Sequence, residues 1–203
     1  MKDKSIKYKD LMKNRVHEIL LISSPYDSFI LEEEGSLTEQ ILNEYVGMNL
    51  SYAPRVWRAS TARQANKMLG QRVFDLVIMM LRIPDMAALK LGQRIKGKYP
   101  KIPVILLAFD QSEIEQLPKD TSGSFDNVFL WSGNSNVFPA IIKHIEDKKN
   151  ISRDIKNGDV RAIMLVEDNP RYYSLIFPVI YREIIFHTRN LLSSTLNDEE
   201  RLL

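Results

Sequence analysis

The stretch Leu76-Val-Ile-Met-Met-Leu81 decides the fold that this sequence predicts. Every residue in it is apolar, so a strand formed here has no side suited to water. Strands of this kind lie at the centre of parallel sheets, where helices cover both faces. We therefore expect a central, buried strand with helices above and below it.

Short apolar runs and amphipathic segments alternate on either side of this stretch. The other runs that predict strands are residues 19–22, 55–58, 104–108 and 127–131. The segments that predict helices are residues 27–45, 62–69, 86–96, 113–116 and 137–145. Gly35 interrupts the first of these helices, and either Ser60 or Thr61 can cap the second.

Five strands alternating with five helices predict an α/β fold, a doubly wound parallel sheet of the flavodoxin-like class. Right-handed crossovers favour the strand order 2-1-3-4-5. This domain is expected to span residues 16–147. Residues 1–15 contain the one basic run of the chain and are expected to form a solvated leader.

The composition excludes several kinds of function. Of the 203 residues, 44% are hydrophobic and 27% charged, and the formal net charge is +2. That charge is too small to indicate a nucleic-acid partner, which needs clustered Lys and Arg. The chain has no cysteine, which suits the cytoplasm and excludes disulfides. Its apolar runs are far shorter than the ~20 residues of a membrane helix, so we expect no membrane partner.

Two segments resemble the receiver domain of two-component response regulators. The stretch from Asp75 to Leu89 is similar to that family's third strand and following loop, including an Ile-Pro-x-Met turn that begins at Ile83. Lys101-Ile-Pro-Val-Ile-Leu-Leu-Ala108 resembles its fourth strand. The resemblance covers residues 16–147 and implies a module of phosphorelay signal transduction.

A working receiver gathers five groups at the C-terminal ends of its strands. Two acidic residues after the first strand help to hold Mg²⁺, which takes oxygen ligands. An aspartate at the end of the third strand accepts the phosphoryl group. A Thr or Ser on the fourth strand and a Lys on the fifth hold the phosphate oxygens.

None of these five groups is present here. The matching positions, in the same order, are Ser23, Ser24, Met80, Ala108 and Ser132. Trp131 takes the lysine position if the register slips by one residue. The resemblance therefore implies a degenerate, non-phosphorylatable receiver, with no catalytic residue and no cofactor, and not an enzyme.

The two nearby carboxylates are not expected to replace the missing aspartate. Asp75 precedes the third strand and so lies at the wrong end of the sheet, and Asp85 lies in the loop beyond Pro84. Met80 is expected to fill the altered site with apolar volume. A small-molecule sensor, in which this altered pocket binds an uncharged ligand, is the alternative.

The main functional hypothesis is an interaction module. Phe129 sits where receivers commonly carry an aromatic residue that reports activation, and Trp131 follows on the same side of the strand. We expect these residues to mark a face, next to the fourth and fifth helices, that binds a protein partner or the chain's own C-terminal part.

The segment after residue 147 repeats the opening of the domain. Residues 148–160 predict a linker or a continuation of the preceding helix. Ala162-Ile-Met-Leu-Val-Glu-Asp-Asn-Pro170 then resembles a receiver's first strand, now with the acidic pair intact as Glu167 and Asp168. Residues 161–203 are thus expected to be the truncated start of a second receiver-like domain. Glu167 and Asp168 would bind Mg²⁺ only if that domain were completed.

A strand and a helix are expected to form this C-terminal extension. The helix between Tyr172 and Phe186 carries apolar groups almost all round and should be buried. Pro178 predicts a kink or a break in it. We expect the helix to pack on the first domain or on a second chain, which would make a homodimer.

A narrower resemblance concerns the N-terminal residues. Tyr8-Lys-Asp-Leu-Met-Lys-Asn-Arg-Val-His-Glu-Ile-Leu-Leu-Ile22 and the following SSPYD run resemble the N-terminal regulatory segment of phosphoenolpyruvate synthase or pyruvate phosphate dikinase-like proteins. This resemblance implies, as a further alternative, the regulatory part of an ATP-dependent enzyme whose catalytic region is not within these residues.

Overall fold

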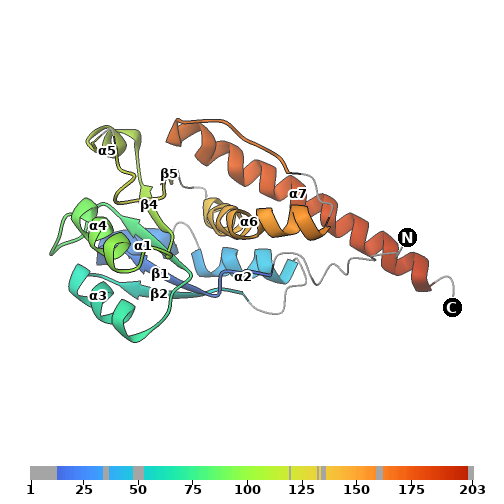
Figure 1. Ribbon diagram of the computed structural model, residues 1–203, viewed down its shortest axis with the longest axis horizontal. Helices are drawn as coiled ribbons and strands as arrows, with labels where there is room; N and C mark the ends of the chain where they lie inside the picture. Colours follow the sequence, from blue (N-terminus) through green and yellow to red (C-terminus); the bar gives the residue numbers. More distant parts are fainter. Residues whose placement is uncertain are drawn as a thin grey trace.

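The computed structural model describes residues 13–33, 37–47, 53–118, 120–131, 133, 136–158 and 162–200. A parallel sheet forms its centre, with the order β2-β1-β3-β4-β5 (Figure 1). The strands are β1 (Glu18–Ile22), β2 (Arg55–Ala59), β3 (Leu76–Met80), β4 (Val104–Ala108) and β5 (Asn127–Leu130). The predicted fold class and strand order are confirmed.

Helices cover both faces of the sheet. They are α1 (Pro25–Glu33), α2 (Leu37–Gly47), α3 (Ala62–Gln71), α4 (Ala88–Lys98), α5 (Gln111–Glu115), α6 (Val137–Gly158) and α7 (Pro170–Glu200). The single helix expected at residues 27–45 is two helices, on either side of residues 34–36, which lie outside the described residues. Thr61, and not Ser60, caps α3 by accepting a hydrogen bond from the Gln64 amide.

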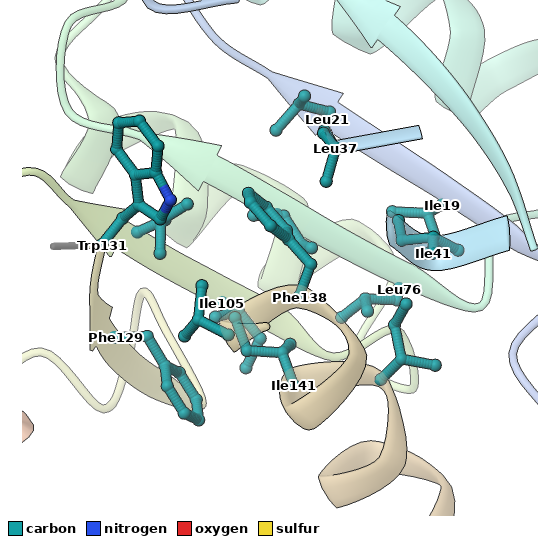
Figure 2. Packing of buried hydrophobic residues seen from close by; sticks show 14 of the residues in the cluster. Ile19, Leu21, Leu37, Ile41, Leu76, Ile105, Phe129, Trp131, Phe138 and Ile141 are labelled. Atoms are coloured by element: carbon teal, nitrogen blue, oxygen red, sulfur yellow. The ribbon is translucent and has the colours of Figure 1, made fainter. Parts of the chain in front are cut away.

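Two apolar clusters hold the helices to the sheet. Side chains alternate along β3, so that Leu76, Ile78 and Met80 enter one cluster while Val77 and Met79 enter the other. The first cluster contains residues of α2 and α6 and is drawn in Figure 2. The second contains residues of α3 and α4. The central strand is therefore buried on both faces, as predicted.

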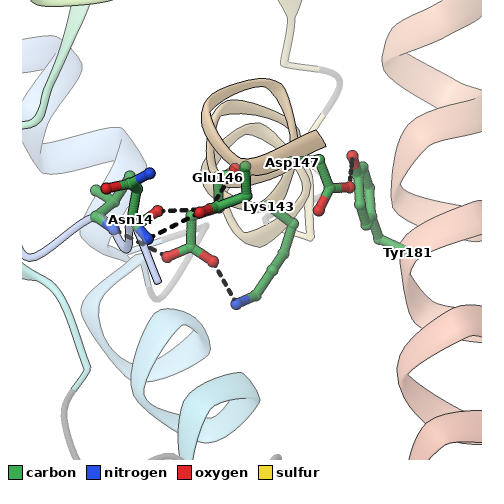
Figure 3. Close-up of polar contacts among 7 residues, drawn as sticks. Asn14, Lys143, Glu146, Asp147 and Tyr181 are labelled. Carbon is green, nitrogen blue, oxygen red and sulfur yellow. Dashed lines mark hydrogen bonds and ion pairs between the residues drawn. The ribbon is translucent and has the colours of Figure 1, made fainter. Parts of the chain in front are cut away.

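Polar groups bind the residues just before β1 to α6 (Figure 3). The Glu146 carboxylate is fully buried, accepts a hydrogen bond from the Val16 amide at 2.9 Å, and pairs with Lys143 at 2.7 Å. Asn150 and Asn14 exchange two hydrogen bonds of 2.9 Å. These contacts fix the chain where it enters the sheet. The predicted leader otherwise lies outside the described residues up to residue 12.

The structure decides three expectations about the C-terminal extension. Of the two readings of residues 148–160, the structure has the continued helix, because α6 reaches Gly158. Residues 162–166 form no strand, since no neighbouring strand in the described chain pairs with them. Helix α7 is not broken at Pro178.

Among the side chains of α7 whose burial the structure describes, up to His187, those on one side of the helix are buried. Tyr173 and Ser174 are buried where α7 lies along α6 and the edge of β5 (Figure 1). The prediction that this helix packs on the first domain is correct for that side. The prediction that it is buried all round is wrong, because apolar residues on its other side are exposed. Within the described residues, no helix has the length and apolar character needed to cross a membrane.

Candidate functional site

Of the positions expected to correspond to a receiver's phosphoacceptor site, those that the structure describes lie at the C-terminal edge of the sheet. Met80 and Ala108 are the last residues of the adjacent strands β3 and β4, and Ser23 directly follows β1. All three are at most 1% exposed. Ser24 is partly buried beside them. Ser132 lies outside the described residues.

The two serine hydroxyls serve the local structure. The Ser23 and Ser28 hydroxyl oxygens are 2.6 Å apart and share a hydrogen bond. Ser24 Oγ accepts a hydrogen bond from the Asp27 amide at 3.1 Å, in the first turn of α1. An acidic pair at these positions could hold a cation, whereas these hydroxyls help to start a helix.

Apolar atoms surround Met80, the residue expected at the phosphoacceptor position. Met80 belongs to the same buried cluster as Leu107, Trp131 and Phe138. A thioether has no oxygen that could accept a phosphoryl group, and it bears no charge that could attract a metal ion. At this position the edge of the sheet is continuous with the hydrophobic core.

Asp27 is a buried carboxylate that the sequence analysis missed. It is fully buried in the first turn of α1, and neither carboxylate oxygen has a hydrogen-bond partner among the described residues. Burial raises the pKa of this carboxyl, while Ser24 and the Arg82 guanidinium partly oppose that rise. The one sequence signal was an Asp three residues beyond the position of the lost acidic pair.

A charged cleft opens beside this edge. Arg82 pairs with Glu113 at 2.9 Å and lies over the Phe109 ring, with 5.8 Å between the guanidinium carbon and the ring centroid. The cleft has a volume of about 430 Å³. Its lining residues are Leu81, Arg82, Asp110, Ser112, Glu113, Gln116 and Leu117. It lies beside the phosphoacceptor position and does not include Met80.

The two carboxylates considered as replacements have structural contacts. Asp75 lies at the opposite end of the sheet, where it accepts hydrogen bonds from the His17 and Glu18 amides at 2.8 and 3.0 Å. Asp85 accepts hydrogen bonds from the Ala62 and Arg63 amides at 2.6 and 3.0 Å. Those two bonds lower the pKa of Asp85. Both residues stabilise the ends of neighbouring elements.

Within the described part of the chain, the acidic pair of the extension forms a local turn contact. Glu167 accepts a hydrogen bond from the Asn169 amide at 2.9 Å, and Asp168 is exposed. Across the described residues, no group of three or more acidic or histidine side chains is arranged to hold a metal ion.

The predicted interaction face is buried. Phe129 and Trp131 are 0% and 4% exposed. Two aromatic residues of α7 cover Phe129, with ring centroids 5.2 Å away for Tyr173 and 5.9 Å for Phe177. Phe177 also stacks on His144 of α6 at 4.9 Å. An external partner could therefore reach Phe129 only after α7 had moved.

Side chains of α7 also cap the open edge of the sheet. The Leu130 amide donates a hydrogen bond to Ser174 Oγ at 2.8 Å, and the Tyr173 hydroxyl donates one to the Val128 carbonyl. β5 is an edge strand, and these are backbone groups that a further strand would otherwise pair with. Burial raises the pKa of Tyr173 to about 12, which keeps this hydroxyl a donor.

A third polar contact fixes α7 to α6. The Tyr181 hydroxyl donates a hydrogen bond to Asp147 Oδ2 at 2.8 Å (Figure 3). Burial raises the pKa values of both groups. Helix α7 thus covers β5 and α6 on one side of the domain. This side also includes α5, and we call it the α5–β5–α6 face.

Receiver domains are among the solved structures that resemble this chain. The receiver domain of NtrX from Brucella abortus is 16% identical, with a TM-score of 0.50, and the match covers 64% of this chain and 98% of that domain. A signal receiver domain of an HD domain-containing protein from Pseudomonas fluorescens Pf-5 is 23% identical, with a TM-score of 0.49, over 70% of this chain and 94% of that one.

TrrA, a response regulator from Thermotoga maritima solved in complex with Mg²⁺ and BeF, is 20% identical, with a TM-score of 0.49, over 64% of this chain and 98% of that one. No protein-family model and no curated protein matches the sequence. The similarity to NtrX supports the receiver-type fold that the strand order gives independently.

Proposed function

We propose that this chain is a receiver-like signalling module that cannot be phosphorylated and that acts by binding protein. The buried Met80 at the C-terminal end of β3 carries the proposal. In a receiver the phosphoacceptor is a carboxylate beside a cation site, and Met80 supplies neither a carboxylate nor a metal ligand. Ala108 and Ser23, the buried neighbours of Met80 at this edge, add no charge.

Partner binding is assigned to the α5–β5–α6 face and to α7. In this domain α7 occupies the face, so the chain's own C-terminal part is its first partner. A protein partner would compete with α7 for Phe129, or would bind the exposed side of α7. A second chain docked on that exposed side would give a homodimer.

The absence of phosphoryl chemistry can be tested with a phosphoryl mimic. Beryllium fluoride with Mg²⁺ stabilises a protein that binds it, because binding to the folded state raises the free energy of unfolding. We expect no change in the Tm of this chain at concentrations that shift the Tm of a phosphorylatable receiver used as a control. A comparable shift here, absent when Mg²⁺ is replaced by EDTA, would contradict the proposal.

A small-molecule sensor is the second candidate, and the charged cleft favours it. The Met80 position is filled, so the ligand site would be the cleft that Arg82 and Glu113 line. A thermal-shift screen of small polar compounds tests this candidate. A hit whose effect is lost in Arg82→Gln, but kept in the exposed variant Arg182→Gln on α7, would support a sensor.

A further inference from the structure

The helices on one face of the sheet belong to a part of the chain with an excess of positive charge. Helices α3 and α4 pack on the face opposite to α2 and α6, through the second apolar cluster. Residues 62–101, which contain both helices, have nine Lys or Arg and two acidic residues, Asp75 and Asp85. Their net charge is +7 in a chain whose formal net charge is +2, so the other residues have a net charge of −5. The small net charge of the chain conceals this local excess.

Helix α4 carries a row of cations on one side. Its opposite side faces the loop before β5, because Lys96 pairs with Asp126 at 2.8 Å and a Cβ on Gly92 would lie 2.7 Å from the Ser124 carbonyl oxygen. Three exposed cations, spaced four residues apart, share the other side. They are Lys90, Arg94 and Lys98. Because α3 precedes β3 and α4 follows it, this row lies on the side of α4 nearer to α3.

Helix α3 adds two cations on the side that faces α4. Its far side is marked by Arg72, just after the helix, whose guanidinium carbon lies 3.9 Å from the ring centroid of Trp57 in the edge strand β2. Arg63 and Lys67 are exposed and lie on the opposite side of the helix. The Arg63 amide donates a hydrogen bond of 3.0 Å to Asp85, in the loop that leads into α4. Arg63, Lys67 and the three cations of the α4 row form what we call the α3–α4 basic face.

These five cations form no ion pair with a carboxylate among the described residues. The ion pairs of the described chain join other side chains. Asp85 lies near Arg63, but both of its oxygens accept hydrogen bonds from amides of α3. Like charges gathered on one surface repel each other, and an anionic partner relieves that repulsion.

The face favours an acidic protein segment over other polyanions. Neither helix contains an aromatic residue, so the bases of a nucleic acid would find no ring on which to stack. Neither helix has an exposed large apolar side chain that would enter a membrane. A long polyanion would also extend beyond the face to residues whose net charge is negative, whereas a short acidic segment would not.

The spacing of the cations matches the spacing of carboxylates on a helix. Residues four apart on a helix are separated by about 6 Å along its axis. The α4 row is therefore about 12 Å long, on a helix of 11 residues. A partner helix with Glu or Asp at every fourth residue repeats at the same distance. When the two helices lie side by side, one carboxylate can lie opposite each cation of the row.

We propose that the α3–α4 basic face binds an acidic helical segment of a protein partner. The carboxylates of that segment pair with the α4 row, while Arg63 and Lys67 contact its other side. Because α7 contacts β5 and α6, a partner bound here would leave α7 in place. This inference goes beyond the proposed function and does not depend on whether the domain is phosphorylated.

Fluorescence anisotropy with a labelled acidic peptide tests the proposal. The probe has about four Glu-Ala-Ala-Ala repeats, which place Glu at every fourth residue of a helix. A control peptide has Gln in place of each Glu. We expect saturable binding of the Glu peptide, at least about tenfold tighter than that of the Gln peptide. Its affinity should fall as salt is added, because salt screens exposed charges.

Two sets of charge reversals locate the binding, at an ionic strength of about 0.1 M, where charges more than about 10 Å apart are largely screened. The first set reverses the α4 row and should weaken binding at least about tenfold. It consists of Lys90→Glu, Arg94→Glu and Lys98→Glu. The second set changes the net charge equally at exposed cations of α6 and α7 and should change the affinity less than about threefold. It consists of Lys148→Glu, Lys156→Glu and Arg171→Glu.

Circular dichroism shows whether each set of variants folds like the parent. Gln at the three positions of the α4 row removes the charges without adding new ones. That set should also weaken binding, by a smaller factor than the Glu set, and it replaces the Glu set in the comparison if the Glu set unfolds.

Three results would overturn the proposal. One is binding of the Glu peptide that is absent or no tighter than that of the Gln peptide. Another is equal weakening by the two sets of reversals, which would show that net charge and not the α3–α4 basic face governs binding. The third is tighter binding of a single-stranded oligonucleotide or of phosphatidylserine vesicles that depends on the α4 row, which would make the face a nucleic-acid or membrane site.

Discussion

At the scale of single residues, Met80 and Asp27 define what the C-terminal edge of the sheet can do. The buried side chain of Met80 extends the hydrophobic core to the position that corresponds to the phosphoacceptor of a receiver. Asp27 puts a buried carboxyl nearby, with Arg82 and Glu113 as its charged neighbours. Asp27 is therefore a carboxyl group near this edge, but its burial does not expose it for phosphoryl transfer.

Asp27 gives the chain a pH-dependent stability of predictable sign. Because burial holds the pKa of its carboxyl above the usual 3.8, the group stabilises the folded state at low pH, and this contribution is lost as the pH rises through the raised pKa. Asp27→Asn mimics the protonated form. The variant should be more stable than the parent at pH 7, and the difference should vanish as the pH approaches 3.8 or below.

Urea denaturation across this pH range measures the effect, with Asp85→Asn as a control of opposite sign. Backbone amides lower the pKa of Asp85, so its carboxylate stabilises the protein above pH 3.8 and ceases to do so as the pH falls. Asp85→Asn should therefore be less stable than the parent at pH 7. If Asp27→Asn were also less stable there, the Asp27 carboxylate would have a stabilising cationic partner.

The sequence predicted the residues of the degenerate edge but not Asp27. Ser23, Met80 and Ala108 follow from their places at the ends of apolar runs, because a strand's end fixes which residue reaches the edge. Asp27 was assigned only to the beginning of a helix. Its burial depends on the tertiary packing around α1, where Arg82 and Glu113 are its charged neighbours, and local sequence patterns do not encode that packing.

At the scale of secondary-structure elements, helix α7 has two structural roles. It covers Phe129 with aromatic rings and satisfies the open edge of β5 through Ser174 and Tyr173. Edge strands are liable to pair with other chains unless something covers them. Helix α7 therefore closes the sheet and occupies the α5–β5–α6 face at the same time.

Substitutions on the inner side of α7 should destabilise the chain. Phe177→Ala removes a ring that contacts Phe129 and His144, and should lower the free energy of unfolding by about 2 kcal/mol. Ser174→Ala leaves the Leu130 amide without its acceptor and should cost about 1 kcal/mol. Phe186→Ala, on the exposed outer side, should change stability by no more than about 0.5 kcal/mol.

Denaturation followed by tryptophan fluorescence gives these values, since Trp131 is buried in the same cluster as Phe129. Equal effects of Phe177→Ala and Phe186→Ala would show that α7 does not rest on the domain by its inner side.

Element prediction succeeded for the five strands of the sheet and failed in the C-terminal extension, where residues 162–166 form no strand and one helix meets two environments. Residues 104–108 were predicted with the observed bounds, because five apolar residues between polar turns leave little choice. For α7 the sequence showed apolar residues all round but not which of them are covered. That depends on what lies next to the helix, and residues 163–166 remain unpaired for the same reason.

At the scale of the whole molecule, a complete five-stranded domain carries an extension that is only half packed. The order of strands could be predicted because right-handed crossovers leave few ways to thread five parallel strands. The position of α7 could not, because the alternating pattern ends before it. The polar contacts that hold it, at Ser174, Tyr173 and Tyr181, have no signature in sequence.

Removing the C-terminal extension should expose the α5–β5–α6 face and promote self-association of the domain. A chain that ends at Gly158 keeps the five strands but exposes Phe129 and the backbone groups of β5. We expect it to self-associate more strongly than the 203-residue chain in sedimentation velocity, and to bind more of a hydrophobic dye. A truncated chain as monomeric as the parent, with unchanged dye binding, would show that α7 is not needed to protect this face.

We propose that the domain spanning residues 16–147 cannot accept a phosphoryl group. Intact-mass spectrometry after incubation with acetyl phosphate and Mg²⁺ tests it most directly, with a phosphorylatable receiver treated in parallel. We expect no mass increase for this chain under conditions that fully modify the control. An increase of one phosphoryl group, mapped by peptide analysis to a carboxylate such as Asp27 or Asp85, would contradict it.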